Sequence, residues 1–137
     1  MLRSAAKFTL ILALLITGCG GQPTPAAGPV VVSNINSRVT IPAGFVQTVF
    51  LHMQAGQRAE GTITVRSTYS VDIPDVSVSF LAEDPSGRVA VNASRVNGVQ
   101  VFSLIAGTTG RYNLVLDNSH SLIIPAEVDV VAQVWSR

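Results

Sequence analysis

The clearest strand signal in this chain is Asp75-Val76-Ser77-Val78-Ser79-Phe80-Leu81-Ala82-Glu83, which is followed by Asp84-Pro85-Ser86-Gly87. Apolar and polar side chains alternate along residues 75–83, which is the pattern of a strand that buries one face. The next four residues are turn formers, because proline presets φ and glycine tolerates the exit geometry. A strand that ends in a tight turn is therefore the first element that the sequence predicts.

The same alternation recurs on both sides of this unit. It predicts strands at residues 45–53, 61–66, 88–94, 99–105, 111–117 and 127–135, and one or two short strands within 30–41. The side chains expected to face the core are Val76, Val78, Phe80, Ala82, Val89, Val91, Ala93, Tyr112, Leu114, Leu116, Val128, Val130, Ala132 and Val134. No segment has a convincing 3.6-residue period. We therefore expect an all-β antiparallel β-sandwich or jelly roll of about eight strands.

One strand is expected at the centre of a sheet. Residues 99–105 are apolar on both faces, which is typical of a strand with a neighbour on each side. Asn97-Gly98 directly before it is a common two-residue hairpin turn. The sequence therefore predicts a hairpin between residues 88–94 and 99–105.

The charge of the chain argues against one class of partner. Nine basic residues face eight acidic ones, and removal of a leader that carries Arg3 and Lys7 leaves a net charge of about −1. No basic stripe occurs, so the sequence has no electrostatic footprint for nucleic acid. The single cysteine cannot form an internal disulfide, so the core alone must hold the fold.

The amino terminus is typical of an exported protein. Positive residues precede the apolar segment 8–16, which is too short to span a membrane. The following Ile16-Thr17-Gly18-Cys19 resembles the lipobox of bacterial lipoproteins, in which signal peptidase II cleaves before the cysteine. The resemblance implies cleavage between Gly18 and Cys19 and a lipid anchor of palmitate-like acyl chains on Cys19. The alternative is an ordinary signal peptide that is cut elsewhere and leaves a free thiol.

Three regions follow from this reading. Residues 1–18 are the expected signal peptide, residues 19–29 a lipidated cysteine with a flexible tether rich in glycine and proline, and residues 30–137 one domain. The expected location is the cell envelope, facing the periplasm or the exterior. Delivery to an outer membrane, where one exists, fits Gly20, which stands where an aspartate would retain a lipoprotein in the inner membrane.

Three blocks of the domain then suggest a family. Ile41-Pro42-Ala43-Gly44 precedes a strand, residues 78–87 form a strand that ends in a D-P-x-G turn, and residues 110–121 combine a G-x-Y strand with an asparagine-serine turn. This order resembles the GOLD domain of the emp24/gp25L/p24 family over most of residues 41–135. The resemblance implies a β-sandwich used for protein–protein contacts.

The chain also departs from that family. Family members commonly carry a cysteine where this chain has Val115, and they continue into a coiled coil, a membrane span and a sorting tail where this sequence ends at Arg137. The resemblance therefore implies the fold but not a role in vesicle traffic. A second resemblance, to the pre-peptidase C-terminal domains of exported bacterial proteins, implies a carbohydrate- or calcium-binding accessory module.

Catalytic groups are sparse. His52 lies on a predicted strand, and His120 lies in a turn near Asp117 between Ser119 and Ser121. These residues could be combined into a weak triad, but turns use the same residue types to hydrogen-bond their own backbone. No nucleophile elbow of the G-x-S-x-G kind occurs. We therefore expect no catalytic residues and no enzyme activity.

Acidic residues at strand ends are the candidates for a metal site, because loop oxygens are ligands for calcium. They are Asp72, Asp75, Glu83, Asp84 and Asp117. Isolated acidic residues of this kind usually cap turns or keep strand ends soluble. We expect no metal ion and no cofactor, with a calcium site as the alternative.

Two aromatic residues remain as candidates for partner contacts. Tyr69 follows a predicted strand, and Trp135 has the outward parity of the last strand. The alternative is that Tyr69 covers a loop edge and Trp135 packs at a strand end. The sequence thus predicts a lipoprotein whose sandwich is a non-catalytic protein-binding or envelope-assembly module, with a protein partner in the envelope and no identified small-molecule ligand.

Overall fold

A computed structural model describes residues 27–69 and 76–136 of the 137-residue chain. The expected signal peptide, the expected lipobox with Gly18 and Cys19, and the first residues of the expected tether lie outside the described residues. The same holds for Asp72 and Asp75.

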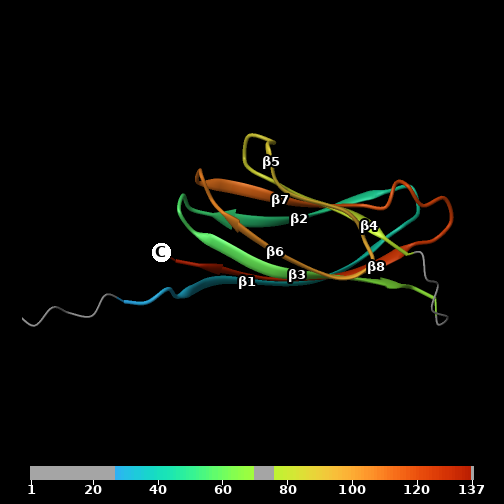
Figure 1. The fold of residues 1–137 in the computed structure, drawn as a ribbon, viewed down its shortest axis with the longest axis horizontal. Helices are drawn as coiled ribbons and strands as arrows, with labels where there is room; N and C mark the ends of the chain where they lie inside the picture. Colours follow the sequence, from blue (N-terminus) through green and yellow to red (C-terminus); the bar gives the residue numbers. More distant parts are fainter. Residues whose placement is uncertain (1–26, 70–75, 137) are drawn as a thin grey trace, which may run out of the picture.

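The described chain forms eight strands (Figure 1). They are β1 (Val31–Ile41), β2 (Val46–Met53), β3 (Arg58–Ser67), β4 (Val78–Glu83), β5 (Val89–Val96), β6 (Gly98–Ile105), β7 (Gly110–Asp117) and β8 (Ala126–Trp135). Each strand expected from the alternation is present, and residues 31–41 form one long strand. No helix of the described residues has the length and hydropathy needed to cross a membrane.

The strands form two four-stranded antiparallel sheets, which confirms the predicted fold class. One sheet has the order β1-β8-β3-β6 and the other the order β2-β7-β4-β5. Among the described strands, β4 and β5 are the only consecutive pair that lie side by side, so the chain otherwise passes from one sheet to the other at each connection. Two such sheets face to face make an eight-stranded jelly roll.

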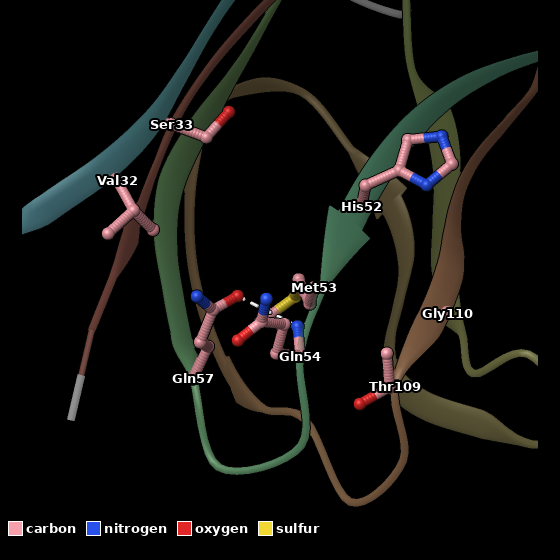
Figure 2. Close-up of a pocket in the computed structure, with 8 residues that line it drawn as sticks. All are labelled: Val32, Ser33, His52, Met53, Gln54, Gln57, Thr109 and Gly110. Atoms are coloured by element: carbon pink, nitrogen blue, oxygen red, sulfur yellow. Dashed lines mark hydrogen bonds between the residues drawn. The ribbon is translucent and has the colours of Figure 1, made fainter.

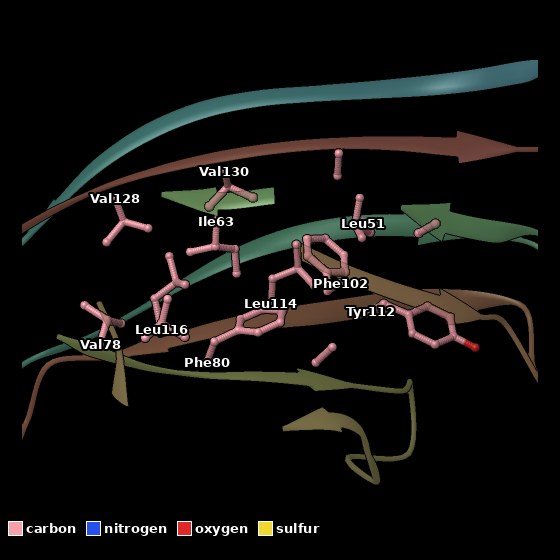
Figure 3. Packing of buried hydrophobic residues seen from close by; sticks show 14 of the residues in the cluster. Leu51, Ile63, Val78, Phe80, Phe102, Tyr112, Leu114, Leu116, Val128 and Val130 are labelled. Carbon is pink, nitrogen blue, oxygen red and sulfur yellow. The ribbon is translucent and has the colours of Figure 1, made fainter. Parts of the chain in front are cut away.

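The core lies between the sheets (Figure 3). Buried side chains alternate along the strands as predicted, and the largest of them include Tyr112, Phe80, Ile63, Leu114 and Leu116. The rings of Phe80 and Phe102 meet across the two sheets at 5.2 Å between centroids, tilted by 49°. Such tilted pairs add to the stabilisation that comes from area burial.

The predicted central strand is wrong. Among the described strands, β6 pairs only with β3 and forms the edge of its sheet. Phe102 and Leu104 face the core, whereas Val99, Val101 and Ile105 are 66 %, 67 % and 70 % exposed. Apolar residues on both faces of a strand therefore marked an edge with an exposed apolar face.

The predicted hairpin at Asn97-Gly98 is also wrong. β5 belongs to one sheet and β6 to the other, so this link turns a corner between the sheets. Gly98 adopts a φ of 80°, which a glycine accepts without strain. The same sharp turn serves a hairpin or a corner, and only the pairing partners distinguish them. Val89, expected in the core at the start of β5, is instead 48 % exposed.

Candidate functional site

The sandwich has two ends of different character. At one end, here the entry end, the chain enters β1 and leaves β8, and the amide of Ser136 donates a hydrogen bond to the carbonyl of Val30 at 2.7 Å. At the other end, here the distal end, lie the loop 42–45, the loop 118–125 and the chain on either side of residues 70–75 (Figure 1). β3 runs from the entry end to the distal end, since Arg58 pairs with Trp135 and Ser67 with Ala126.

Asn118 fixes the base of the distal loops. Its side chain is buried, and Nδ2 donates to the carbonyls of Ile41 at 3.1 Å, Pro42 at 3.3 Å and Ile124 at 3.0 Å. Its main chain also accepts from the amide of Gly44 at 3.1 Å and donates to the carbonyl of Phe45 at 2.9 Å. One side chain therefore joins the loop 42–45 to both sides of the loop 118–125.

Ser121 closes the second half of the 118–125 loop. Its hydroxyl donates to the carbonyl of Ile124 at 2.9 Å and accepts from the amide of the same residue at 3.0 Å. The two residues between them, Leu122 and Ile123, are 91 % and 80 % exposed. The loop thus presents two large apolar side chains on a hydrogen-bonded base.

Other apolar side chains are exposed at the same end. Phe45, in the neighbouring loop, is 62 % exposed, and Tyr69, two residues beyond β3, is 52 % exposed. The distal apolar residues are therefore Phe45, Tyr69, Leu122 and Ile123. Single exposed apolar residues are ordinary, but several large ones on the loops of one end are typical of an interaction surface.

A small polar pocket lies beside these residues. It has a volume of about 200 Å³ and is lined by Val76, Ser77, Arg95, Asn118, His120, Ser121 and Ile124. Within it, Oγ of Ser77 lies 3.1 Å from Nε2 of His120. We call it the Arg95 pocket.

The backbone of Arg95 is unusual. Its φ is 55°, and it is the one residue other than glycine with a positive φ among the described residues. It lies where β5 slips in register against β4, since Val78 pairs with Val96 but Phe80 pairs with Ala93. Such a bulge bends the strand and re-aims a side chain. The left-handed conformation costs energy in any residue that has a Cβ atom.

The geometry around His120 falls short of a catalytic triad. A triad needs a carboxylate that orients the histidine, and among the described residues no carboxylate hydrogen-bonds to His120. Asp117 is the nearest candidate in sequence, but its Oδ1 accepts the amide of Ser119 at 2.7 Å. Hydrogen bonds from Ser119, with a smaller contribution from the charge of His120, lower the pKa of Asp117 below its ordinary value. Asp117 is thus a turn cap, and the serine beside His120 is Ser77 rather than Ser119 or Ser121.

The two predicted contact aromatics lie at opposite ends. Tyr69 is at the distal end, and Trp135 is at the entry end on the outer face of its sheet. Trp135 is half-buried beside the ion pair of Arg58 with Glu60, and its indole nitrogen is buried without a hydrogen-bond partner among the described residues. The two side chains therefore do not form one surface.

A second hollow lies at the entry end (Figure 2). It has a volume of about 350 Å³ between the start of β1 and the end of β2. Oε1 of Gln57 accepts a hydrogen bond from the amide of Gln54 there at 2.8 Å. His52 directly precedes Met53, the last residue of β2. His52 is exposed and is the one titratable residue of this lining, so the hollow brings no second ionisable group to it.

The acidic candidates do not come together in the described part of the chain. No group of three or more His, Cys, Asp or Glu side chains is placed there to hold a metal ion. Oδ1 of Asp84 accepts from the amide and hydroxyl of Ser86 at 2.9 and 2.6 Å and from the amide of Arg88 at 2.9 Å. These bonds, led by the Ser86 hydroxyl, lower the pKa of Asp84. Glu83 ends β4 directly before this turn.

Sequence reasoning missed several distal residues. Leu122 and Ile123 lie outside any alternating segment, and the run of three apolar residues between a turn and Pro125 was the available signal. Ser77 meets His120 across 43 positions, which no local pattern indicates. Arg95 had no local signal either, because a bulge depends on the partner strand.

Comparison with known proteins adds little beyond the fold. No protein-family model and no curated protein matches the sequence. Among solved structures, the chain is similar to PliG of Aeromonas hydrophila, a periplasmic inhibitor of g-type lysozyme, with 14 % identity and a TM-score of 0.48 over 73 % of this chain and 86 % of that one. It is also similar to a de novo designed double-stranded β-helix, with 17 % identity and a TM-score of 0.43 over 72 % and 97 % of the two chains. Likenesses at this level assign no function.

Proposed function

We propose that this chain is an exported, lipid-anchored β-sandwich of GOLD-like type that binds a protein partner in the cell envelope through its distal end and catalyses no reaction. The lipobox resemblance supports the anchor, and the sandwich fold is compatible with the GOLD resemblance. The distal loops supply the binding surface.

The observation that carries the proposal is the exposure of Leu122 and Ile123 on a fixed loop. These two large apolar side chains are 91 % and 80 % exposed to water, which is unfavourable. A partner that covers them removes this apolar area from water and so gains binding free energy. The hydrogen bonds of Asn118 and Ser121 hold the loop before any partner arrives. A surface that is already ordered loses less conformational entropy on binding.

The proposed anchor would attach the domain to the membrane at the end opposite the distal loops. A lipid on Cys19 would be followed by residues 20–29, which span at most roughly 30 Å at about 3 Å per residue. The chain then enters the domain at the entry end. The lipid would therefore be attached at the end opposite the distal apolar residues, which leaves these residues accessible to other envelope proteins.

Cell fractionation tests the anchor. The Cys19→Ala variant is expected to leave the membrane fraction for the soluble periplasmic or extracellular fraction, because the acyl chains provide the membrane affinity. If the variant stayed with the membrane, the lipid anchor would be ruled out.

Cross-linking in intact cells tests the binding surface. A partner captured by the wild-type chain should be lost from the Leu122→Ser/Ile123→Ser double variant. The matched control is Val101→Ser/Ile105→Ser, which removes two exposed apolar side chains from the part of β6 that leads to the entry end. Both variants should unfold at the temperature of the wild type. Loss of the partner in both variants, or in neither, would contradict the distal surface.

A further inference from the structure

We propose that the Arg95 pocket binds a carboxylate group of the partner, held by Arg95 and the Ser77–His120 pair. The inference deepens the proposed function and rests on it for the identity of the ligand. It concerns a separate set of residues, so the two can fail independently.

Arg95 has a backbone conformation that is unfavourable for arginine. A left-handed φ of 55° suits glycine, yet the position carries arginine. The bulge that creates this conformation also places Arg95 on the pocket wall. Strain of this kind is a hint of function when the side chain at the strained position has a use.

Arg95 also has no counter-ion in the described part of the chain. Arg38, Arg58, Arg66 and Arg88 each form an ion pair there, and Arg111 lies over the ring of Phe50. Arg95 forms none of these contacts. Arg95 is an exposed residue of the pocket lining, so its guanidinium has donors available for the two oxygens of a carboxylate.

Two of the hydrogen-bond donors that line the pocket are already satisfied within the chain. The amide of Asn118 and the hydroxyl of Ser121 are already used by main-chain carbonyls. Arg95, Ser77 and His120 therefore remain to contact a ligand. Asp117, directly before the pocket residue Asn118, is a carboxylate close enough to His120 for their charges to interact. The site therefore suits a singly charged carboxylate better than a doubly charged phosphate.

The position of the pocket indicates which kind of partner segment would reach it. Ser121 and Ile124 line it, and they flank the exposed Leu122 and Ile123. A partner that covers these two side chains would bring its neighbouring residues to the pocket. The matching segment has a carboxylate, from an acidic side chain or a chain terminus, beside apolar residues.

Sodium acetate is the first probe, titrated into the full chain in detergent micelles and followed by nuclear magnetic resonance. We expect saturable shift changes at Ser77, Arg95 and His120 that sodium chloride at equal ionic strength does not reproduce. Two capped peptides then separate the sources: acetyl-leucyl-aspartyl amide carries only a side-chain carboxylate, and acetyl-leucyl-alanine carries only a terminal one. The stronger binder identifies the source. Absence of saturable shifts with all three probes would overturn the proposal.

The decisive variant is Arg95→Gly. It should raise the denaturation midpoint, because glycine accepts the left-handed backbone, and should weaken acetate binding at least tenfold. Arg111→Gln, which removes the same charge at the entry end, should leave acetate binding unchanged. If Arg95→Gly bound acetate like the wild type, the pocket assignment would be wrong. A different result would leave the pocket assignment intact. If the wild type bound acetate but Leu122→Ser/Ile123→Ser still captured the partner, only the proposed function would be wrong.

Discussion

The side-chain amide of Asn118 donates a hydrogen bond of 3.1 Å to the main-chain carbonyl of Ile41, 77 positions earlier in the chain. Ile41 is the last residue of β1, and Asn118 directly follows β7, so the bond joins an edge strand of one sheet to the loop that leaves the other. Together with the bonds to Pro42 and Ile124, it makes the distal end one hydrogen-bonded unit. The binding surface that we propose depends on this unit.

Replacement of Asn118 should therefore be costly. Asn118→Ala leaves buried carbonyls without their donor and should lower the free energy of unfolding by about 2–3 kcal/mol. Asn118→Asp should cost at least as much, because a carboxylate would then face carbonyl oxygens. Denaturant unfolding measures both. The exposed Asn36 on β1 is the control, and Asn36→Ala should stay within about 0.5 kcal/mol of the wild type. A loss of less than about 0.5 kcal/mol for Asn118→Ala would contradict this role.

Gly61 on β3 gives a second test, of the core. A Cβ atom there would lie 2.5 Å from the main-chain oxygen of Val131 and 2.7 Å from two ring carbons of Phe102. Gly61→Ala should therefore displace the Phe102 ring and cost about 1–3 kcal/mol. Gly107→Ala is the control, since its Cβ would meet nothing within 4 Å. Equal stability of the two variants in thermal unfolding would show that Phe102 does not cover Gly61.

The register of β8 predicts opposite behaviour for two adjacent valines. Val130 is fully buried and Val131 is 44 % exposed on the outer face. Val130→Thr places a hydroxyl in the core and should cost about 1–3 kcal/mol. Val131→Thr should change the free energy of unfolding by less than about 0.5 kcal/mol. The reverse order would mean that β8 is shifted by one residue.

Asp129 on the outer face predicts a pH dependence. Its Oδ1 lies 2.6 Å from Nε of Arg38 and its Oδ2 lies 3.1 Å from Nη1 of Arg66, on the strands to either side. The hydrogen bond from Arg38, and then the charges of both arginines, lower the pKa of Asp129 in the folded chain. The folded pKa therefore lies below the unfolded value of about 3.9. The stabilisation is complete above the unfolded value and is lost as the pH falls through the folded one.

Comparison with Asp129→Asn isolates this contribution. The difference in unfolding free energy between wild type and variant should be constant from about pH 7 to pH 5 and should shrink below about pH 4. Asp84 and Asp117 have pKa values shifted in the same direction, but they are present in both proteins and cancel. A difference that grows toward acid pH would have the wrong sign for the ion pairs of Asp129.

Alternation predicted which side chains enter the core but not which strands are neighbours. Residues such as Phe80, Leu114 and Val130 are buried as expected because a period of two depends only on the strand itself. Strand order depends on contacts between distant segments. The placement of β6 at the edge and the corner at Asn97-Gly98 were therefore outside the reach of local patterns.

Some residues of the candidate site have a local sequence signal, whereas others depend on contacts between distant segments. His120 and Asp117 could be picked out because turn residues cluster in sequence, but the serine that meets His120 lies on the chain before β4. Arg95 depends on a bulge, and a bulge is defined only against its partner strand. Of the two aromatic residues proposed for partner contact, only Tyr69 lies beside the distal loops.

Site-specific photo-crosslinking in intact cells tests whether the distal loop contacts a protein partner. A photoreactive residue at position 122 should give a discrete adduct with an envelope protein, because Leu122 lies at the tip of the distal loop. The same residue at position 105 replaces Ile105, which is 70 % exposed on the edge strand β6, and should give no such adduct. A specific adduct at 105 with none at 122 would show that the partner binds at the edge strand and not at the distal loop.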